Sequence, residues 1–271
     1  MSPEVSQPDP APADGGGLDP EKLGIPILRL GPVDGVVLKP AGMATELTRD
    51  PRGESLLARL KHAAAPGVIP RLVHRLDRPT RGLVVVALTK DAAAYHGEQI
   101  REGLWDKYYL ARIPWPRSGP RSILGLHKAH LREEDNRSRI VHSGGKLALL
   151  EVLAVEPAPG RTTSGEASGD QRRPAAADAH ALIRLLTGRL HQVRVMMAGL
   201  GVPLVGDDVY AADARAGHTT AGFYLEHIAL RHRAADTHEE VVSYLRNDPD
   251  RELVSPALLQ RLESELEMPK E

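Results

Sequence analysis

The sequence predicts an α+β domain with a mixed, largely antiparallel sheet flanked by helices. Short apolar segments of strand length recur along the chain, and amphipathic helical patterns fall between them without the regular strand–helix alternation of a parallel sheet. The 271 residues are 41% hydrophobic and 26% charged, which is the balance of a globular protein with a sizeable core.

Five segments have the composition of strands, because they are short, apolar and rich in β-branched residues. They are residues 35–38, 83–88, 108–113, 147–155 and 179–186. Between the last two lies a stretch rich in Pro, Gly and Ser, residues 157–177, which predicts a surface loop inserted within one domain.

Helical patterns separate these strands. Residues 54–65 carry leucines at helical spacing and stop at Pro-Gly, and residues 91–101 follow a Thr89 cap. Residues 187–201 predict a third helix with Thr187 as its N-cap and Gly201 at its end. A last amphipathic helix begins at Ser255-Pro256. The apolar stripes of these two helices are Leu190, Val193, Met197 and Leu200, and Leu259, Leu262 and Leu266.

The ends of the chain differ from its middle. Residues 1–22 are Pro, Gly, Ala and Asp with little that is apolar, so we expect a disordered acidic tail and a fold that begins near Leu23. One folded domain is expected over residues 23–247, followed by an acidic amphipathic helix within residues 248–271.

Composition excludes several classes of protein. The chain has no cysteine, which removes disulfide frameworks, thiolate zinc sites, iron–sulfur clusters and a cysteine nucleophile. It has no run of about eighteen apolar residues and no secretory signal pattern, so we expect a cytoplasmic protein without a membrane span. Aromatic residues are only 3%, which argues against a module that stacks several bases on an aromatic sheet.

Charge is segregated along the chain. Residues 236–271 hold ten acidic and four basic residues, and residues 1–22 hold five acidic residues and one Lys. The whole chain has a formal charge of -1, so residues 23–235 carry +9. A basic middle is typical of a core that binds a polyanion, although acidic ends that only keep the protein soluble explain the pattern equally well.

The first segment with chemistry is VHRLDRPTRGL, residues 73–83. Asp77 stands before Arg78-Pro79, which predicts a loop, and Gly82 permits a tight turn into the next strand. Basic side chains crowd this one carboxylate: His74, Arg75, Arg78 and Arg81. An acid that must stay ionised beside a polyanion suits this pattern, and so does a structural Asp that caps a turn. No ligand cluster accompanies it, so we expect no metal.

Two further segments are basic. The helix over residues 187–201 places His191 and Arg194 on one face near Arg189, which suits a phosphate or a solvated basic face. On the strand that begins near residue 107, Lys107 and Tyr109 share a face. A tyrosine there can pack on a base or belong to the core.

Together these segments resemble the RluA-type family of RNA pseudouridine synthases, with order and spacing that agree from about residue 33 to about residue 242. Residues 36–42 are similar to the family's strand and KPxG turn. The other matches are His74-Arg75-Leu76-Asp77 with Thr80 and Gly82-Leu83 to HRLDxxTSGL, Lys107 and Tyr109 to KxYxA, Gly145-Lys146 to a GK pair, Thr187-Gly188-Arg189 with His191-Gln192 and Arg194 to TGRxHQxR, and Gly201, Pro203 and Gly206-Asp207 to GxPxxGD.

The resemblance implies the pseudouridine synthase fold with a central active-site cleft. It makes Asp77 the essential carboxylate, either a nucleophile toward the ribose or the base that removes a ribose proton. Arg194 would pair with Asp77 and keep it charged, and Tyr109 would stack on the uracil and assist proton removal at C5. The residues implied to bind RNA are His74, Arg75, Arg78, Lys107, Arg189 and His191. The reaction needs neither cofactor nor metal, and a monomer that binds ribosomal or transfer RNA is expected.

The sequence departs from the family pattern at three places. Arg81 stands where relatives carry Ser, Met196 where they carry His, and residues 225–229 replace an LHA motif. The small N-terminal RNA-binding domain of many relatives is not recognisable, so we expect the catalytic domain to bind RNA alone. Two alternatives stay open: a catalytically silent RNA-binding relative, and a metal-dependent nuclease with a carboxylate among arginines.

Overall fold

The computed structural model describes residues 17–47, 54–159, 178–211, 222–246, 248–249 and 251–268. The chain divides into two compact units. The first unit contains Met1–Lys107 and Glu226–Asn247, and the second contains Tyr108–Leu225 and Asp248–Glu271. The boundary falls inside one strand, β5 (Asp106–Pro114), so Lys107 and Tyr109 of the same motif belong to different units.

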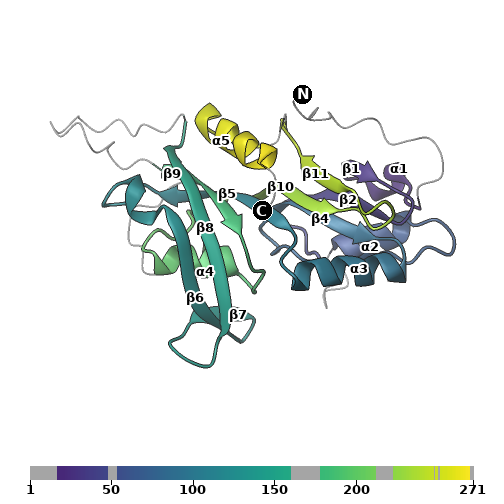
Figure 1. Ribbon diagram of the computed structural model, residues 1–271, viewed down its shortest axis with the longest axis horizontal. Coiled ribbons are helices and arrows are strands. Elements are labelled where there is room, and N and C mark those ends of the chain that lie inside the picture. The colour runs from purple at the N-terminus through teal and green to yellow at the C-terminus, as the bar shows by residue number, and fades with distance from the viewer. Residues whose placement is uncertain are drawn as a thin grey trace. The chain divides into compact units, whose positions relative to one another are not determined.

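The first unit is a mixed sheet with helices (Figure 1). Its strands lie in the order β1 (Ile27–Leu30), β2 (Asp34–Lys39), β4 (Arg81–Ala87) and β10 (Leu225–Arg233). β1, β2 and β4 are antiparallel neighbours, whereas β4 and β10 are parallel. Two more strands join at this sheet, β3 (Arg71–Leu72) beside β4 and β11 (Glu240–Tyr244) beside β10.

Three helices belong to the first unit: α1 (Pro20–Leu23), α2 (Leu56–Ala63) and α3 (Lys90–Arg101). Thr89 caps α3 as predicted, because its side chain accepts the Ala92 N–H at 3.1 Å. α1 packs against α2, and α3 packs against β4. The core beneath contains Val36, Leu38, Leu83, Val85, Trp105 and Leu230.

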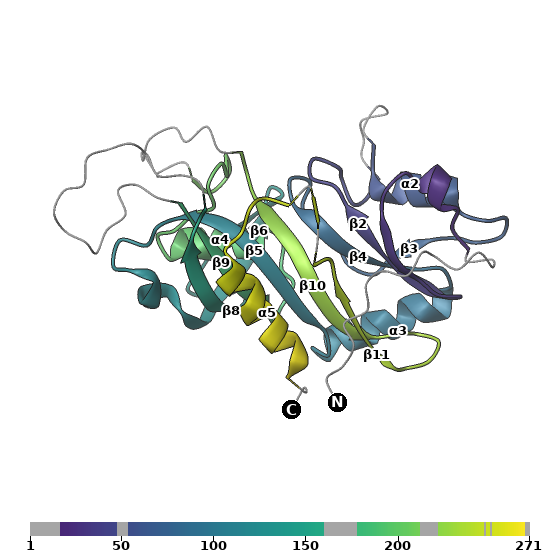
Figure 2. The ribbon, with the colours of Figure 1, turned by 90° about the horizontal axis from the view of Figure 1, so that it is seen from above.

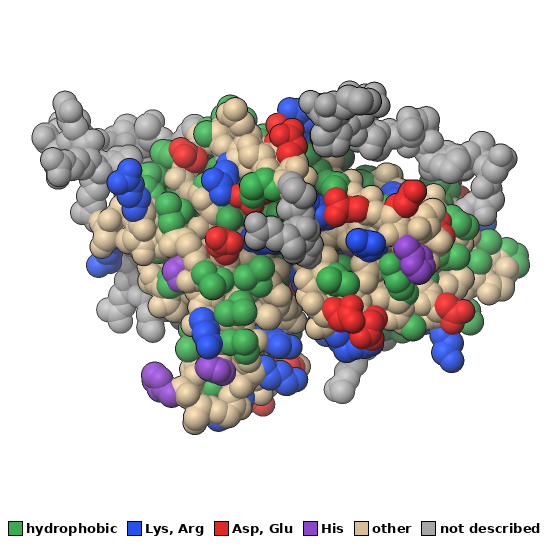
Figure 3. Space-filling view, viewed as in Figure 1, with side chains coloured by type: hydrophobic (Ala, Val, Ile, Leu, Met, Phe, Trp, Pro, Cys, Tyr) green, Lys and Arg blue, Asp and Glu red, His purple; other side chains and the backbone are tan. Residues whose placement is uncertain are grey.

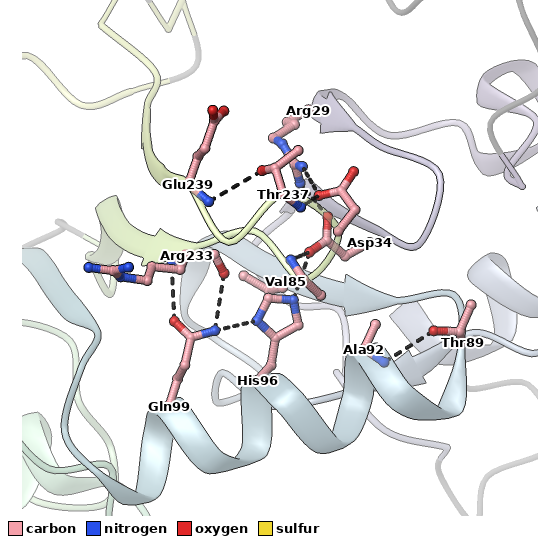
Figure 4. Close-up of polar contacts among 12 residues, drawn as sticks. Arg29, Asp34, Val85, Thr89, Ala92, His96, Gln99, Arg233, Thr237 and Glu239 are labelled. Carbon is pink, nitrogen blue, oxygen red and sulfur yellow. Dashed lines mark hydrogen bonds and ion pairs between the residues drawn. The ribbon is translucent and has the colours of Figure 1, made fainter.

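Buried polar bonds attach α3 to the sheet (Figure 4). His96 Nε2 lies 2.8 Å from Asp34 Oδ2, and Arg29 pairs with the same carboxylate. Gln99 makes two bonds with the backbone of Arg233, at 3.0 and 3.1 Å. Burial raises the pKa of Asp34, but the hydrogen bonds from His96 and Arg29 outweigh this and hold it well below its usual value. Asp34 is therefore an ionised anchor for the helix.

The strands of the second unit follow in the order β5, β9 (Asp178–Leu185), β8 (Lys146–Pro157), β6 (Gly125–Glu134) and β7 (Arg137–Ile140). From β9 to β7 all neighbours are antiparallel. The short helix η1 (Pro120–Ile123) precedes β6. α4 (Gln192–Gly199) packs beside β7, and α5 (Pro256–Glu267) packs against β8. Figure 2 shows α5 beside β8.

The predicted α+β class is confirmed, but the helix expected over residues 187–201 begins five residues late. His191 is its N-cap and has a positive φ of 51°, so the chain before it is not helical. Thr187 does not cap the helix. Its Oγ1 accepts the Leu149 N–H at 2.9 Å and donates to Gln192 Oε1 at 2.8 Å, which ties the loop to β8.

The expected ends also change. Leu18 is buried and α1 begins at Pro20, so structure starts before Leu23, while residues 1–16 of the predicted tail lie outside the described residues. Of the predicted loop, residues 160–177 likewise lie outside them. α5 belongs to the second unit, and its buried face is Leu258, Leu262 and Glu265, rotated from the predicted stripe. Among the described residues, no helix is long and apolar enough to span a membrane.

Candidate active site

Asp77 lies half-buried on the loop between β3 and β4, as predicted, and both of its neighbours are fixed. Thr45 Oγ1 donates to the Leu76 carbonyl at 2.6 Å and accepts the Leu76 N–H at 3.1 Å. The Gly42 N–H donates to the Arg78 carbonyl at 2.8 Å, and Arg78 Nε returns a bond to the Gly42 carbonyl at 3.0 Å. The segment 42–45 therefore holds the backbone on each side of the carboxylate.

Lys39, the last residue of β2, lies beneath this loop. Its side chain is fully buried, and Nζ donates to the carbonyls of Pro40 at 2.9 Å, Met43 at 2.8 Å and Arg78 at 3.4 Å. Burial lowers the pKa of Lys39 to about 8, and attraction to Asp77 partly opposes that shift. The sequence alone predicts no role for Lys39 in the site, although a lysine that ends an apolar strand before Pro-x-Gly is a visible signal.

The arginines around Asp77 differ in their surroundings. Arg75 is exposed and pairs with Glu46, and the Arg78 side chain is also exposed. Arg81 is different: its side chain is only 12% exposed and its Nε lies 3.7 Å from the buried Glu226 carboxylate. Arg75 and Arg78 are thus surface cations beside the loop, whereas Arg81 belongs to the contact between β4 and β10.

His74 is bonded to a strand, and its expected contact with RNA stays a prediction. Its Nε2 accepts the Val85 N–H at 2.9 Å, which requires a neutral ring nitrogen. Burial holds the pKa of His74 well below its usual value, and the neighbouring charges of His227 and Lys107 lower it further. A neutral imidazole bonded to a strand is a structural group.

Arg194, on the first turn of α4, is a buried cation with a defined partner. Its Nε and Nη2 each donate to Asp207 at 2.8 Å, a two-bond pair, and its Cζ lies 5.3 Å from the ring centre of Tyr210 and 5.4 Å from that of Phe223. Asp207 also accepts the Val209 and Tyr210 N–H groups. Burial raises the pKa of Asp207, but Arg194 reverses this and lowers it overall. The predicted Arg194–Asp77 pair stays a prediction.

Arg189 and His191 precede the helix and do not share its face with Arg194. Arg189 is exposed, and its Nε donates to the Leu147 carbonyl at 2.9 Å. His191 Nδ1 lies 3.0 Å from the Tyr210 hydroxyl, which also accepts the Ser138 N–H at 2.9 Å. The structure therefore places both residues on the loop that leads into α4.

Tyr109 is only 6% exposed on β5, so it is as buried as a core tyrosine, while Lys107 is partly exposed. Of the predicted catalytic residues, Asp77 lies in the first unit, and Tyr109 and Arg194 lie in the second. Their joint action stays a prediction. Within the described ranges, no group of three or more His, Asp or Glu side chains is arranged to hold a metal ion.

Comparison with known proteins decides the family. Residues 35–199 match the family described as RNA pseudouridylate synthase. The dual-specificity RNA pseudouridine synthase RluA of Escherichia coli K12 is 32% identical over 203 residues, which cover 73% of this chain and 83% of RluA. The chain belongs to this family. Its resemblance is of the RluA type, and the enzyme is therefore an RNA pseudouridine synthase.

Other relatives agree with this assignment. The ribosomal large subunit pseudouridine synthase D of Pseudomonas aeruginosa is 30% identical over 186 residues, which cover 66% of this chain and 51% of that protein. Two solved structures share the fold, human RNA pseudouridylate synthase domain containing 1 and 4. Their TM-scores are 0.59 and 0.57 at 24% and 19% identity; each match covers 88% of this chain, and 94% and 91% of the human chains.

Proposed function

We propose that this pseudouridine synthase acts on uridine in a structured RNA, ribosomal or transfer RNA, and that Asp77 is its essential carboxylate. The observation that carries the proposal is the loop of Asp77. The carboxylate is half-buried, its backbone neighbours are fixed by Thr45 and Gly42, and the buried Lys39 attracts its negative charge. An ionised and oriented carboxylate is what the reaction requires.

The conversion of uridine to pseudouridine requires a carboxylate at the ribose, and we propose that Asp77 supplies it. The N1–C1′ bond of uridine breaks, the uracil turns, and a C5–C1′ bond forms, after which C5 loses its proton and N1 gains one. Asp77 acts at the ribose, as a nucleophile at C1′ or as the base that removes a ribose proton. By resemblance, Tyr109 stacks on the uracil and assists proton removal at C5, while the charge of Arg194 favours ionised Asp77.

Exposed cations support the RNA-binding part of the proposal. Arg75 and Arg78 flank Asp77 in the first unit, and Arg189 precedes α4 in the second. The hairpin of β6 and β7 adds a cluster of Lys, Arg and His side chains, which gathers at the lower left of Figure 3. Its exposed members are Lys128, Arg132, Arg137, Arg139 and the following His142. We name this cluster the hairpin surface and propose that it binds phosphates.

A pocket beside the hairpin surface contains one of the departures from the family pattern. It has a volume of about 360 Å³ and lies between the hairpin and α4, with Lys128, His130 and His142 in its lining. Met196 lines the same pocket where relatives carry His. The Met substitution therefore alters the surface that we propose to meet RNA, and the substrate rather than the reaction is where we expect this enzyme to differ from its relatives.

The test of the catalytic role is Asp77→Asn in a tritium-release assay on RNA that carries tritium at C5 of uridine. The amide has the shape of the carboxylate but is neither nucleophile nor base, so turnover should fall by more than about a thousandfold while RNA affinity is unchanged. Asp91→Asn, an exposed Asp on α3, is the matched control and should keep full activity. Turnover of Asp77→Asn within tenfold of wild type would remove Asp77 from its role.

The same assay tests the alternative of a catalytically silent RNA-binding relative, because such a protein would bind RNA and release no tritium.

The test of the RNA surface is the salt dependence of binding. With several phosphate contacts, affinity should drop by about a hundredfold or more between roughly 50 and 200 mM salt, and Arg137→Gln with Arg139→Gln should reduce the slope. A flat response would contradict the proposal. We further propose that the enzyme is a cytoplasmic monomer, which sedimentation and cell fractionation test.

A further inference from the structure

Strand β4, which follows the Asp77 loop, has one edge shared by two different strands. β3 pairs with Val86 and Ala87, and β10 pairs in parallel with Arg81 and Gly82. The stretch 83–85 lies between these two partners. Alternate residues of a strand direct their N–H and C=O groups to the same edge, so Leu83 and Val85 both present backbone groups there. A buried backbone group without a partner costs about 1–3 kcal/mol.

Two histidine side chains take the place of strand neighbours in this gap. His74 Nε2 accepts the Val85 N–H at 2.9 Å, and His227 Nδ1 donates to the Leu83 carbonyl at 2.7 Å. The two rings meet edge to face with their centres 5.9 Å apart. His74 lies two residues after the end of β3 and three residues before Asp77, whereas His227 belongs to β10. The gap is therefore filled from both sides by imidazoles.

Gly82 allows this arrangement. A Cβ at position 82 would lie 2.4 to 2.8 Å from the backbone atoms of His227, and its φ of +127° is one that side chains rarely adopt. The role expected for Gly82 from the sequence is a tight turn. The structure shows instead a close approach of β10 to β4 within the sheet. This close approach brings the His227 ring beside Leu83.

His74 must be neutral with its proton on Nδ1, because its Nε2 accepts a bond, and His227 needs a proton on Nδ1, because that atom donates. The neutral ring with the proton on Nδ1 satisfies both bonds. Burial favours this state and lowers the pKa of His227 to about 3. The groups that act on His74 are all basic, namely His227, Lys107, His232 and His96, and each disfavours its protonation. The edge of Trp105 packs against the His74 ring, with the two centres 5.3 Å apart.

We propose that His74 and His227 are positioning residues for Asp77, because their neutral imidazoles complete the edge of β4 and fix the chain three residues before the carboxylate. The proposal rests on the proposed role of Asp77. Thr45 and Gly42 hold the residues directly beside Asp77, and His74 holds the start of the same loop. The histidine of this HRLD sequence thus serves the reaction through the backbone and does not contact RNA.

The kinetic test compares two substitutions of one residue. His74→Leu fills similar space without an acceptor, whereas His74→Gln keeps a neutral acceptor of similar reach. His74→Leu should lower kcat by about tenfold to a hundredfold, the effect of a small misplacement of the reacting group, with little change in KM for RNA. His74→Gln should recover kcat to within about threefold, since the acceptor bond is restored. A rise in KM in both variants with unchanged kcat would overturn the proposal.

A second measurement needs neither turnover nor a folded Leu variant. Nitrogen-15 NMR of the wild-type histidines should show His74 and His227 as Nδ1–H tautomers from pH 8 to pH 6, and the Kd for RNA should have the same pH dependence in wild type and His74→Gln. An Nε2–H tautomer, or RNA binding that tightens toward pH 6 only in wild type, would overturn the proposal. The tautomer result also separates a failure here from a failure of the catalytic role of Asp77.

Discussion

The loop of Asp77 and the first turn of α4 both present a charged group, but they are held by different forces. The Asp77 loop is fixed mainly by uncharged groups: the Thr45 hydroxyl, the Gly42 backbone and the His74 imidazole. Arg194 is fixed by an ion pair, because Asp207 accepts two of its N–H groups. The first arrangement keeps its geometry whatever the charge of Asp77, whereas the second exists only while Asp207 is ionised.

This difference fits the work that we propose for each group. A carboxylate that gains and loses a bond or a proton needs a support that does not depend on its own charge. A guanidinium that remains charged throughout needs only a fixed counterion, and a buried one is destabilising without it. The Lys39 ammonium is intermediate, since it donates to three carbonyls and also attracts Asp77.

Removal of the ion pair between Arg194 and Asp207 should have the largest effect. Asp207→Asn removes the charge that accepts two bonds from the buried Arg194, so the free energy of unfolding should fall by about 3–5 kcal/mol and activity should fall with it. Urea denaturation measures this loss. Arg194→Gln should behave similarly. The double variant should lose less than the two single losses together, because both substitutions remove the same interaction. Additive losses would show that the pair contributes little.

Acid should destabilise the first unit at a higher pH than the second unit. His227 and His232 have pKa values of about 3 when folded, because burial disfavours their charged form, against 6.5 when exposed. The unfolded chain binds more protons in that range, so the first unit should lose stability as the pH falls from about 6.5 toward 3. The contribution of Asp207 is complete above its ordinary pKa of 3.8 and is lost only as the pH falls below that value.

Hydrogen exchange followed by mass spectrometry, on peptides from β4 and from α4, would detect this order. We expect β4 to lose protection at a higher pH than α4. Simultaneous opening, or earlier opening of α4, would contradict the assignment of the buried histidines as neutral groups.

The smallest expected effect comes from Thr45→Val, which removes both bonds to Leu76 at nearly constant volume. We expect a loss of about 1–3 kcal/mol in stability and a severalfold loss of kcat as the loop relaxes. Thr89→Val is the matched control, because it removes the cap of α3 at about 1 kcal/mol but lies away from the loop. Stability should fall in both variants and kcat only in the first. Equal kcat losses would mean that Thr45 acts through general stability.

Strands with apolar sequences were predictable, and β2, β4, β8 and β9 lie where the pattern puts them. β10 was missed because half of its buried positions are polar. Glu226, His227, Arg231 and His232 are all at most 3% exposed, which no periodicity of apolar residues can indicate. Their burial depends on partners brought by the fold, such as Arg81 for Glu226. The strands β1, β3, β6, β7 and β11 were also not predicted.

The candidate site was predictable to a similar degree. The Asp77 loop followed from local chemistry, since Asp before Arg-Pro gives a turn. The partner of Arg194 did not follow, because Asp207 stands thirteen positions later and outside any helical spacing. The late start of α4 depends on the left-handed conformation of His191. The apolar stripe of the predicted helix gives no sign of that conformation.

The bond between His227 and Leu83 joins residues 144 positions apart, and it has a consequence for how the protein is made. Synthesis proceeds from the N-terminus, so the ribosome produces the Asp77 loop and strand β4 long before β10. The whole of residues 88–224 must emerge in between. During that interval the edge of β4 is incomplete, and the nascent chain should remain unable to modify RNA until β10 has left the exit tunnel. Contacts of such long sequence separation also slow folding. The pairing of β10 with β4 should therefore determine when activity appears.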